Sequence, residues 1–203
     1  TAQDVYDFGA KVAAVEIART DPNVLYVCTY PGWWDTKRIY RSDDAGKTFT
    51  EITPASTILN GETWMAYDIA VSSTNAKKIW MVRTSPYGGG YPAVDGFRAY
   101  TSDDGGQTWQ NYTTPELNGE GITNIIHLRG TNGGVYIGTD RAVYYRNDNM
   151  PNWALFNNQL PLSTYSVRLV PWYRGGKLRD GTNRSVYEAD FYEQPAPQAQ
   201  IAT

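Results

Sequence analysis

Two segments of the chain are near copies of each other, and this repeat constrains the fold more than any other feature. Residues 42–49 read SDDAGKTF, and residues 102–109, 60 positions later, read SDDGGQTW. Each copy lies between two short runs rich in aromatic or β-branched residues. A third, eroded copy spans residues 147–153 (NDNMPNW). Self-similarity with a period of this length indicates a propeller or a solenoid.

The repeated segment has the composition of a self-contained turn. Its Ser and Asp side chains are suited to accept hydrogen bonds from nearby backbone N–H groups, and Gly46 and Gly106 permit a positive φ. The aromatic residue that ends each copy, Phe49 or Trp109, is expected to pack back beneath the turn. Because such a turn needs no partner from elsewhere in the chain, it can recur in every unit.

Short strands are predicted on both sides of each turn, and no stretch keeps a helical period long enough to form an ordinary helix. This pattern predicts an all-β fold of four-stranded antiparallel units, which is typical of β-propeller blades. We expect about four blades within a propeller segment at residues 1–193, followed by a Pro/Ala/Gln-rich linker at 194–203 that leads to a further module. The predicted blades cover about residues 11–55, 65–114, 121–158 and 164–192.

The two complete copies match the pattern S-x-D-x-G-x-T-[WF], which resembles the Asp box of the BNR-repeat family. Sialidases, sortilin-type receptors and xyloglucanase-type glycoside hydrolases carry this repeat, and the resemblance extends over about residues 11 to 192. It implies a β-propeller in which the Asp box is a structural turn. Residues 177–188 resemble the end of BNR regions in large secreted bacterial multidomain proteins. The implied structural residues are Ser42, Asp44, Gly46, Thr48 and Phe49, and Ser102, Asp104, Gly106, Thr108 and Trp109.

The number of blades raises a packing problem. Propellers of the resembled family usually have six or more blades, whereas this chain has about four, the last incomplete. An open arc would leave two sheet faces uncovered. We therefore expect the remaining blades, or another chain, to cover them; a self-contained four-bladed ring is the alternative. The residues expected near this contact are Val12, Val15, Ile17, Val167, Leu169 and Val170.

In a meandering blade, the Asp-box turns lie on one face of the propeller and the second-to-third and fourth-to-first loops lie on the other. The loops on that second face are rich in aromatic and acidic residues, which stack on sugar rings and bind hydroxyl groups. They predict a carbohydrate-binding surface, and the alternative is that the aromatics pack the loops against the blades. The candidate ligand-binding residues are Trp33, Trp34, Asp35, Trp64, Tyr87, Tyr91 and Asp95.

Composition and isolated residues narrow the function. A formal net charge of −3 argues against nucleic acid as a partner. The apolar runs are too short for membrane insertion. The chain contains a single cysteine, Cys28, so a disulfide within the chain is excluded. It also contains a single histidine, His127. We predict a buried Cys28, no metal ion and no cofactor.

These observations favour a scaffold or a carbohydrate- or protein-binding module of a larger protein, which the resemblance places outside the cell or on its surface. A polysaccharide is a candidate partner. The alternative is a sialidase- or xyloglucanase-like glycoside hydrolase whose catalytic residues lie partly outside this segment. Such an enzyme needs two carboxyl groups at a defined separation. No pair is singled out by its spacing, so we assign no catalytic residue.

Overall fold

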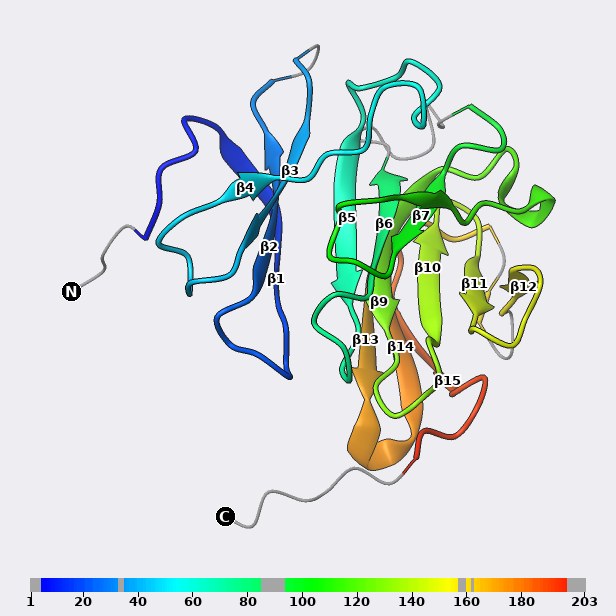
Figure 1. The fold of residues 1–203 in the computed structure, drawn as a ribbon. Helices are drawn as coiled ribbons and strands as arrows, with labels where there is room; N and C mark the ends of the chain where they lie inside the picture. The colour runs from blue at the N-terminus through cyan, green and yellow to red at the C-terminus, as the bar shows by residue number, and fades with distance from the viewer. Residues whose placement is uncertain (1–4, 33–34, 85–93, 157–159, 162, 197–203) are drawn as a thin grey trace.

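The computed structural model describes residues 5–32, 35–84, 94–156, 160–161 and 163–196, and it contains four antiparallel sheets (Figure 1). The described residues include two single-turn 3-10 helices, η1 (Pro115–Leu117) and η2 (Tyr173–Gly175), and no α-helix. The predicted all-β fold is therefore confirmed. We number the sheets blades 1 to 4. Blade 1 contains β1 (Lys11–Ile17), β2 (Leu25–Tyr30), β3 (Arg38–Ser42) and β4 (Thr50–Glu51), and blade 2 contains β5 (Ala66–Val71), β6 (Ile79–Thr84), β7 (Ala99–Ser102) and β8 (Gln110–Asn111). Blade 3 contains β9 (Ile122–His127), β10 (Val135–Thr139), β11 (Val143–Arg146) and β12 (Ala154–Leu155). Blade 4 contains β13 (Ser166–Trp172), β14 (Lys177–Thr182) and β15 (Val186–Asp190).

Each blade is a meander in which consecutive strands pair, and blade 4 has three strands. The first strand of each blade is the innermost one. Strand β5 contacts both β1 and β9, and β9 contacts both β5 and β13. The four blades therefore follow one another as an arc (Figure 1). Pockets lined by residues of all four innermost strands lie towards both ends of these strands, and we call the space between the strands the central channel.

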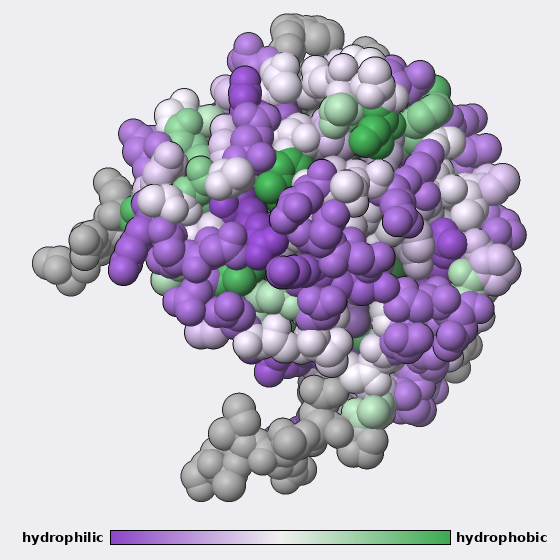
Figure 2. All heavy atoms as spheres, in the orientation of Figure 1, coloured by the Kyte–Doolittle hydropathy of each residue, from purple (hydrophilic) through white to green (hydrophobic). Residues whose placement is uncertain are grey.

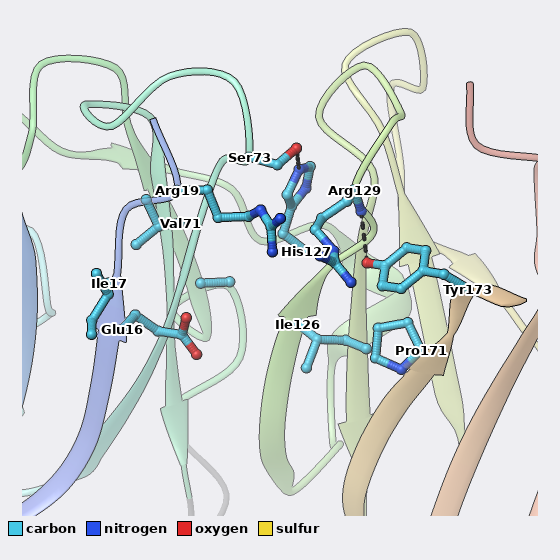
Figure 3. A pocket seen from close by; sticks show the side chains of 11 residues that line it. Glu16, Ile17, Arg19, Val71, Ser73, Ile126, His127, Arg129, Pro171 and Tyr173 are labelled. Atoms are coloured by element: carbon cyan, nitrogen blue, oxygen red, sulfur yellow. Dashed lines mark hydrogen bonds between the residues drawn. The ribbon is translucent and has the colours of Figure 1, made fainter. Parts of the chain in front are cut away.

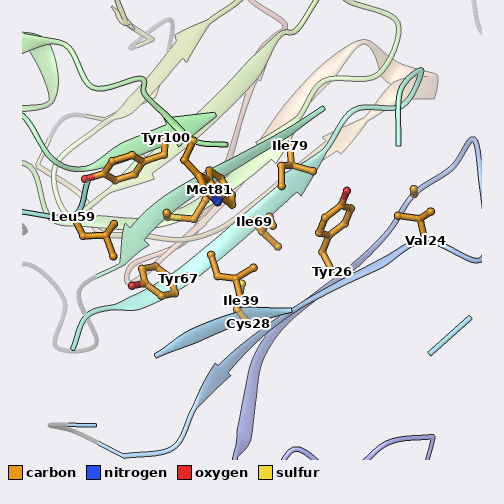
Figure 4. Close-up of a cluster of buried hydrophobic side chains, with 12 residues drawn as sticks. Val24, Tyr26, Cys28, Ile39, Leu59, Tyr67, Ile69, Ile79, Met81 and Tyr100 are labelled. Atoms are coloured by element: carbon orange, nitrogen blue, oxygen red, sulfur yellow. The ribbon is translucent and has the colours of Figure 1, made fainter. Parts of the chain in front are cut away.

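Consecutive blades pack face to face, and one hydrophobic cluster fills each junction. Between blades 1 and 2, Tyr26 and Cys28 meet Ile69, Met81 and Tyr100 (Figure 4). Cys28 has no exposed surface, as predicted. Two further clusters lie at the junctions of blades 2 and 3 and of blades 3 and 4. The core is thus divided among the junctions, so each blade depends on its neighbours.

We call the face of a blade that meets the preceding blade its leading face and the opposite one its trailing face. Val15, Ile69, Ile125 and Leu169 occupy corresponding positions on the leading faces of the four blades. The last three are at most 3% exposed, whereas Val15 is 51% exposed. Val15 is more exposed because, among the described residues, no sheet packs against the leading face of blade 1.

The prediction that six residues flank an open contact is corrected at one position. Val12, Val15 and Ile17 on blade 1 and Val167 and Val170 on blade 4 are all exposed. Leu169 is buried, because its side chain lies on the leading face of blade 4 and packs in the cluster shared with blade 3. Val170 follows Leu169 in a regular part of β13, so its side chain points to the opposite, trailing face.

The two open faces of the arc differ in chemistry. The outer part of the leading face of blade 1 is covered by Tyr6 and Phe8, whose rings pack against Tyr40 and Phe49. The inner strip, formed by β1, stays apolar and exposed. The trailing face of blade 4 combines exposed Val170 and Trp172 with two ion pairs, Lys177–Asp190 and Arg179–Glu188. In the view of Figure 2 hydrophobic residues form small separate patches on a mainly hydrophilic surface.

The β3–β4 and β7–β8 turns have nearly identical hydrogen bonds. In the first, the Gly46 N–H donates to Ser42 Oγ at 2.9 Å, and the Thr48 N–H and hydroxyl donate to Asp44 at 2.9 and 2.7 Å. In the second, the corresponding distances around Ser102 and Asp104 are 2.8, 2.9 and 2.6 Å. These bonds lower the pKa of both carboxyl groups to about 2. Both carboxylates are therefore engaged by their own turns.

Candidate functional site

The loops that were predicted to share one face form a connected belt. The backbone N–H of Lys37 donates to the Thr63 carbonyl at 3.0 Å, which joins the β2–β3 loop to the β4–β5 loop. The Gly119 N–H donates to Asp95 Oδ1 at 2.8 Å and joins the next pair of loops. Each bond ties a loop within a blade to the connection that leads to the next blade, so the belt follows the arc.

The predicted ligand-binding residues are only partly visible on this belt. Asp35 is exposed, Trp64 is half-buried, and Asp95 is exposed. Trp33, Trp34, Tyr87 and Tyr91 lie outside the described residues. The carbohydrate-binding surface therefore stays a prediction.

Two carboxylates on the belt are bound to buried arginines. Arg83, which is 1% exposed, donates to Glu62 at 2.5 Å and to the carbonyl oxygens of Leu59 and Phe97. Arg98 is equally buried and donates to Asp95 at 2.6 Å, and this bond lowers the pKa of Asp95. Ion pairs of this kind hold the loops on the blades. No motif in the sequence indicated these two pairs, because neither Arg83 nor Arg98 belongs to the repeated segment.

A second candidate site lies at the other face, at the end of the central channel. It is a pocket of about 410 Å³ bounded by the ends of the innermost strands (Figure 3). All four blades contribute to it. Its polar lining consists of Glu16 and Arg19 from blade 1, Ser73 from blade 2, His127 and Arg129 from blade 3, and Tyr173 from blade 4.

His127 is a neutral, fixed component of this pocket. Its Nδ1 lies 2.8 Å from the Gly134 carbonyl oxygen, so Nδ1 carries the proton and Nε2 accepts from the Ser73 hydroxyl at 3.1 Å. The ring stacks on Trp80 with centroids 5.2 Å apart. Burial lowers the pKa of His127 to about 4. The imidazole is therefore uncharged at neutral pH.

The channel also contains two partly buried carboxyl groups. Burial, together with the nearby charge of Asp68, raises the pKa of Glu16 to about 7, although Arg168 opposes this shift. The pKa of Asp68 is itself raised by burial, while backbone hydrogen bonds from Ile125 and Ile69 act against the shift. Near neutral pH, Glu16 is thus partly protonated. Nothing in the sequence indicated this pocket, because its residues are spread along the chain from Glu16 to Tyr173.

Comparison with known proteins supports the architecture. No family model matches the sequence, and no curated protein matches it. Among solved structures, the chain is similar to a GH74 enzyme of Niastella koreensis, with a TM-score of 0.58 and 22% identity. It is also similar to YCF48 bound to a D1 peptide (0.61, 15%) and to the extracellular domain of a putative hybrid two-component system of B. thetaiotaomicron (0.58, 14%).

These neighbours have β-propeller folds, and at such identities the likeness concerns the fold alone. The match to the GH74 enzyme covers 87% of this chain and 28% of that protein, and the match to YCF48 covers 91% and 53%. The match to the extracellular domain covers 93% of this chain and 22% of that protein. The predicted propeller architecture with about four blades is confirmed. No helix in the described part of the chain is long and apolar enough to cross a membrane.

Proposed function

We propose that this chain is an Asp-box propeller segment that serves as a scaffold or as a carbohydrate- or protein-binding module of a larger protein. The Asp-box assignment rests on the matching hydrogen bonds of the two turns around Asp44 and Asp104. The division into a propeller at residues 1–193 and a linker at 194–203 is part of the same proposal.

One observation supports the larger assembly. Val15 occupies the position at which Ile69, Ile125 and Leu169 are buried against a preceding blade, yet it is about half exposed. Together with Val12 and Ile17 it leaves an apolar strip that a further blade would cover. We propose that the partner is either the remaining blades of a longer propeller or a second chain.

The loop belt is the proposed binding face, with a polysaccharide as the candidate ligand. Among the described residues, Trp64 is a half-buried aromatic residue, and Asp35 and Asp95 are exposed. The proposal also includes four aromatic residues that lie outside the described residues: Trp33, Trp34, Tyr87 and Tyr91. We place the protein outside the cell or on its surface. This placement is supported by the extracellular domain and the glycoside hydrolases among the proteins of similar fold.

A glycoside hydrolase with catalytic residues partly outside these 203 residues is the alternative. The carboxylates of Glu62 and Asp95 favour it less, because each is held by a buried arginine and is therefore poorly placed for proton transfer. A reducing-sugar assay on xyloglucan with the longest natural form of the protein distinguishes the two. Turnover would replace the scaffold proposal.

The assembly is tested by light scattering on the purified chain and on two variants. We expect species larger than a single chain, and we expect Val15→Glu to shift the distribution towards smaller species. The matched control is Leu155→Glu, at a residue that is 45% exposed on β12 and away from the open strip. A monodisperse wild-type monomer that melts cooperatively would contradict the proposed assembly.

The binding face is tested separately by affinity electrophoresis in gels that contain xyloglucan or another polysaccharide. We expect retardation of the wild-type protein and its loss in the Trp64→Ala and Tyr87→Ala/Tyr91→Ala variants. Tyr6→Ala is the control, because Tyr6 is an exposed aromatic that packs on the Asp-box turn of blade 1. Equal retardation of every variant would place binding elsewhere.

A further inference from the structure

We propose that the pocket at the end of the central channel binds a small organic oxyanion, a carboxylate or a phosphate monoester, between Arg19 and Arg129. This site lies on the face opposite the loop belt. All of its lining residues belong to this chain, and one of them, Ile17, is also part of the apolar strip at the open face of blade 1.

The first argument is that two arginines of the pocket lack an ion-pair partner, although the partly protonated Glu16 carboxyl group lies in the same lining. Figure 3 shows Arg19 and Arg129 entering the pocket from opposite sides, one from the turn after β1 and the other from the turn after β9. Within the part of the chain that the structure describes, neither guanidinium forms an ion pair. Arg19 is exposed and Arg129 is half-buried, so both guanidinium groups are accessible to an anion in the pocket. A carboxylate or phosphate matches their paired N–H donors.

The second argument is that Tyr173 fixes one of these groups and adds a third donor. The Arg129 guanidinium lies over the Tyr173 ring, 3.9 Å from its centroid. The Tyr173 hydroxyl oxygen accepts a hydrogen bond from the backbone N–H of Arg129 at 3.0 Å. Since this bond occupies a lone pair of the oxygen, the hydroxyl proton stays available to a ligand. The planar guanidinium is therefore held in place before a ligand arrives.

The remaining lining selects for a small ligand with an apolar body. Ile17, Val71 and Ile126 form apolar walls, and the volume of about 410 Å³ is within the usual range of small-molecule sites. The Ser73 hydroxyl donates its proton to neutral His127, so neither of these two side chains offers a further donor to the anion. An oxyanion attached to a ring or a short chain fits this combination.

Titration of the full chain with sodium benzoate and with inorganic phosphate at low ionic strength tests the proposal. Isothermal calorimetry gives the affinity, and tryptophan fluorescence reports on Trp80, which stacks on His127. We expect saturable binding of at least one probe, weakened about tenfold or more in Arg19→Gln/Arg129→Gln. Arg38→Gln is the control, because Arg38 is an exposed arginine on β3 that pairs with Glu51 outside the pocket.

The outcomes separate the possible sources of the anion. Binding of benzoate alone supports a carboxylate ligand, and binding of phosphate alone supports a phosphate monoester. Tyr173→Phe, which keeps the ring beneath Arg129, should retain the fold and weaken binding severalfold. Absence of binding by both probes would overturn the proposal. So would an affinity that falls equally in Arg38→Gln, or one that the double variant leaves unchanged.

Discussion

The indole N–H of Trp109 donates a hydrogen bond to the backbone carbonyl oxygen of Ile52, 2.8 Å away, and thereby joins blade 2 to blade 1. Trp153 makes the same bond one blade later, to the carbonyl of Tyr112 at 2.9 Å. The corresponding residue of blade 1 is Phe49, which packs on Tyr6 and Phe8. The aromatic residue that ends each repeat is thus a contact between blades wherever a preceding blade is present.

Replacing Trp109 with Phe tests this contact. The variant keeps most of the buried ring but removes the donor, so the Ile52 carbonyl loses its partner. We expect the free energy of unfolding to fall by about 1 to 3 kcal/mol. Denaturant unfolding followed by circular dichroism measures the loss. Trp172→Phe is the control, since Trp172 is 39% exposed on an open face, and an equal loss there would contradict the account.

The turn around Asp104 predicts a stability effect without an effect on ligand binding. In Asp104→Ala the Thr108 N–H and hydroxyl lose their acceptor, and we expect a loss of about 1 to 3 kcal/mol in the free energy of unfolding. Because the folded pKa of Asp104 is depressed to about 2, its contribution is present above pH 4 and is lost as the pH falls through 2. If Asp104→Ala melted like the wild type but lost polysaccharide binding, the structural role assigned to Asp104 would be wrong.

Asp68 forms another link between blades. It accepts a hydrogen bond from the Ile125 N–H at 3.0 Å, and Asn124 accepts one from the Leu169 N–H of the next blade at 3.2 Å. We expect Asp68→Ala to destabilise the fold by about 1 to 3 kcal/mol. Asp68→Asn should lose less, because the amide oxygen still accepts the bond and no buried charge is left. Thermal melts of both variants test the order, and a greater loss in Asp68→Asn would refute it.

The raised pKa of Glu16 predicts that the stability of the fold depends on pH. Its folded pKa of about 7 lies above the ordinary value of 4.5, so the folded state binds the proton more tightly than the unfolded state. Its contribution to stability is therefore fully present below pH 4.5 and is lost as the pH rises through 7. His127 acts in the opposite direction, because its pKa is lowered to about 4. Its contribution is present above the unfolded pKa and is lost as the pH falls.

The Glu16→Gln variant isolates the first of these contributions. Relative to wild type, we expect it to gain roughly 1 to 3 kcal/mol between pH 4 and pH 8. Urea unfolding at a series of pH values gives the difference curve, in which the His127 contribution cancels. A flat difference curve would mean that the Glu16 carboxyl group is solvated in the folded protein.

Local structure was predictable wherever the sequence carries its own signal. The short strands predicted on both sides of the two repeated turns are present as β3, β4, β7 and β8. The burial of Cys28 also follows from its apolar surroundings. Leu169 was predicted wrongly, because Leu169 and Val170 are neighbours in a regular part of β13 and point to opposite faces, so only one of them can lie on the open face.

The sequence by itself determined the repeat, the all-β class, the number of blades and the turns built from Ser, Asp and Gly. These depend on contacts within a few residues or on a pattern of period two. Only the tertiary structure decided that Leu169 is buried against blade 3, that Arg83 and Arg98 hold the loop belt, and that Arg19 and Arg129 line one pocket. Each of these depends on how the blades pack around the channel, which brings together residues that are far apart in the chain and carry no local signal.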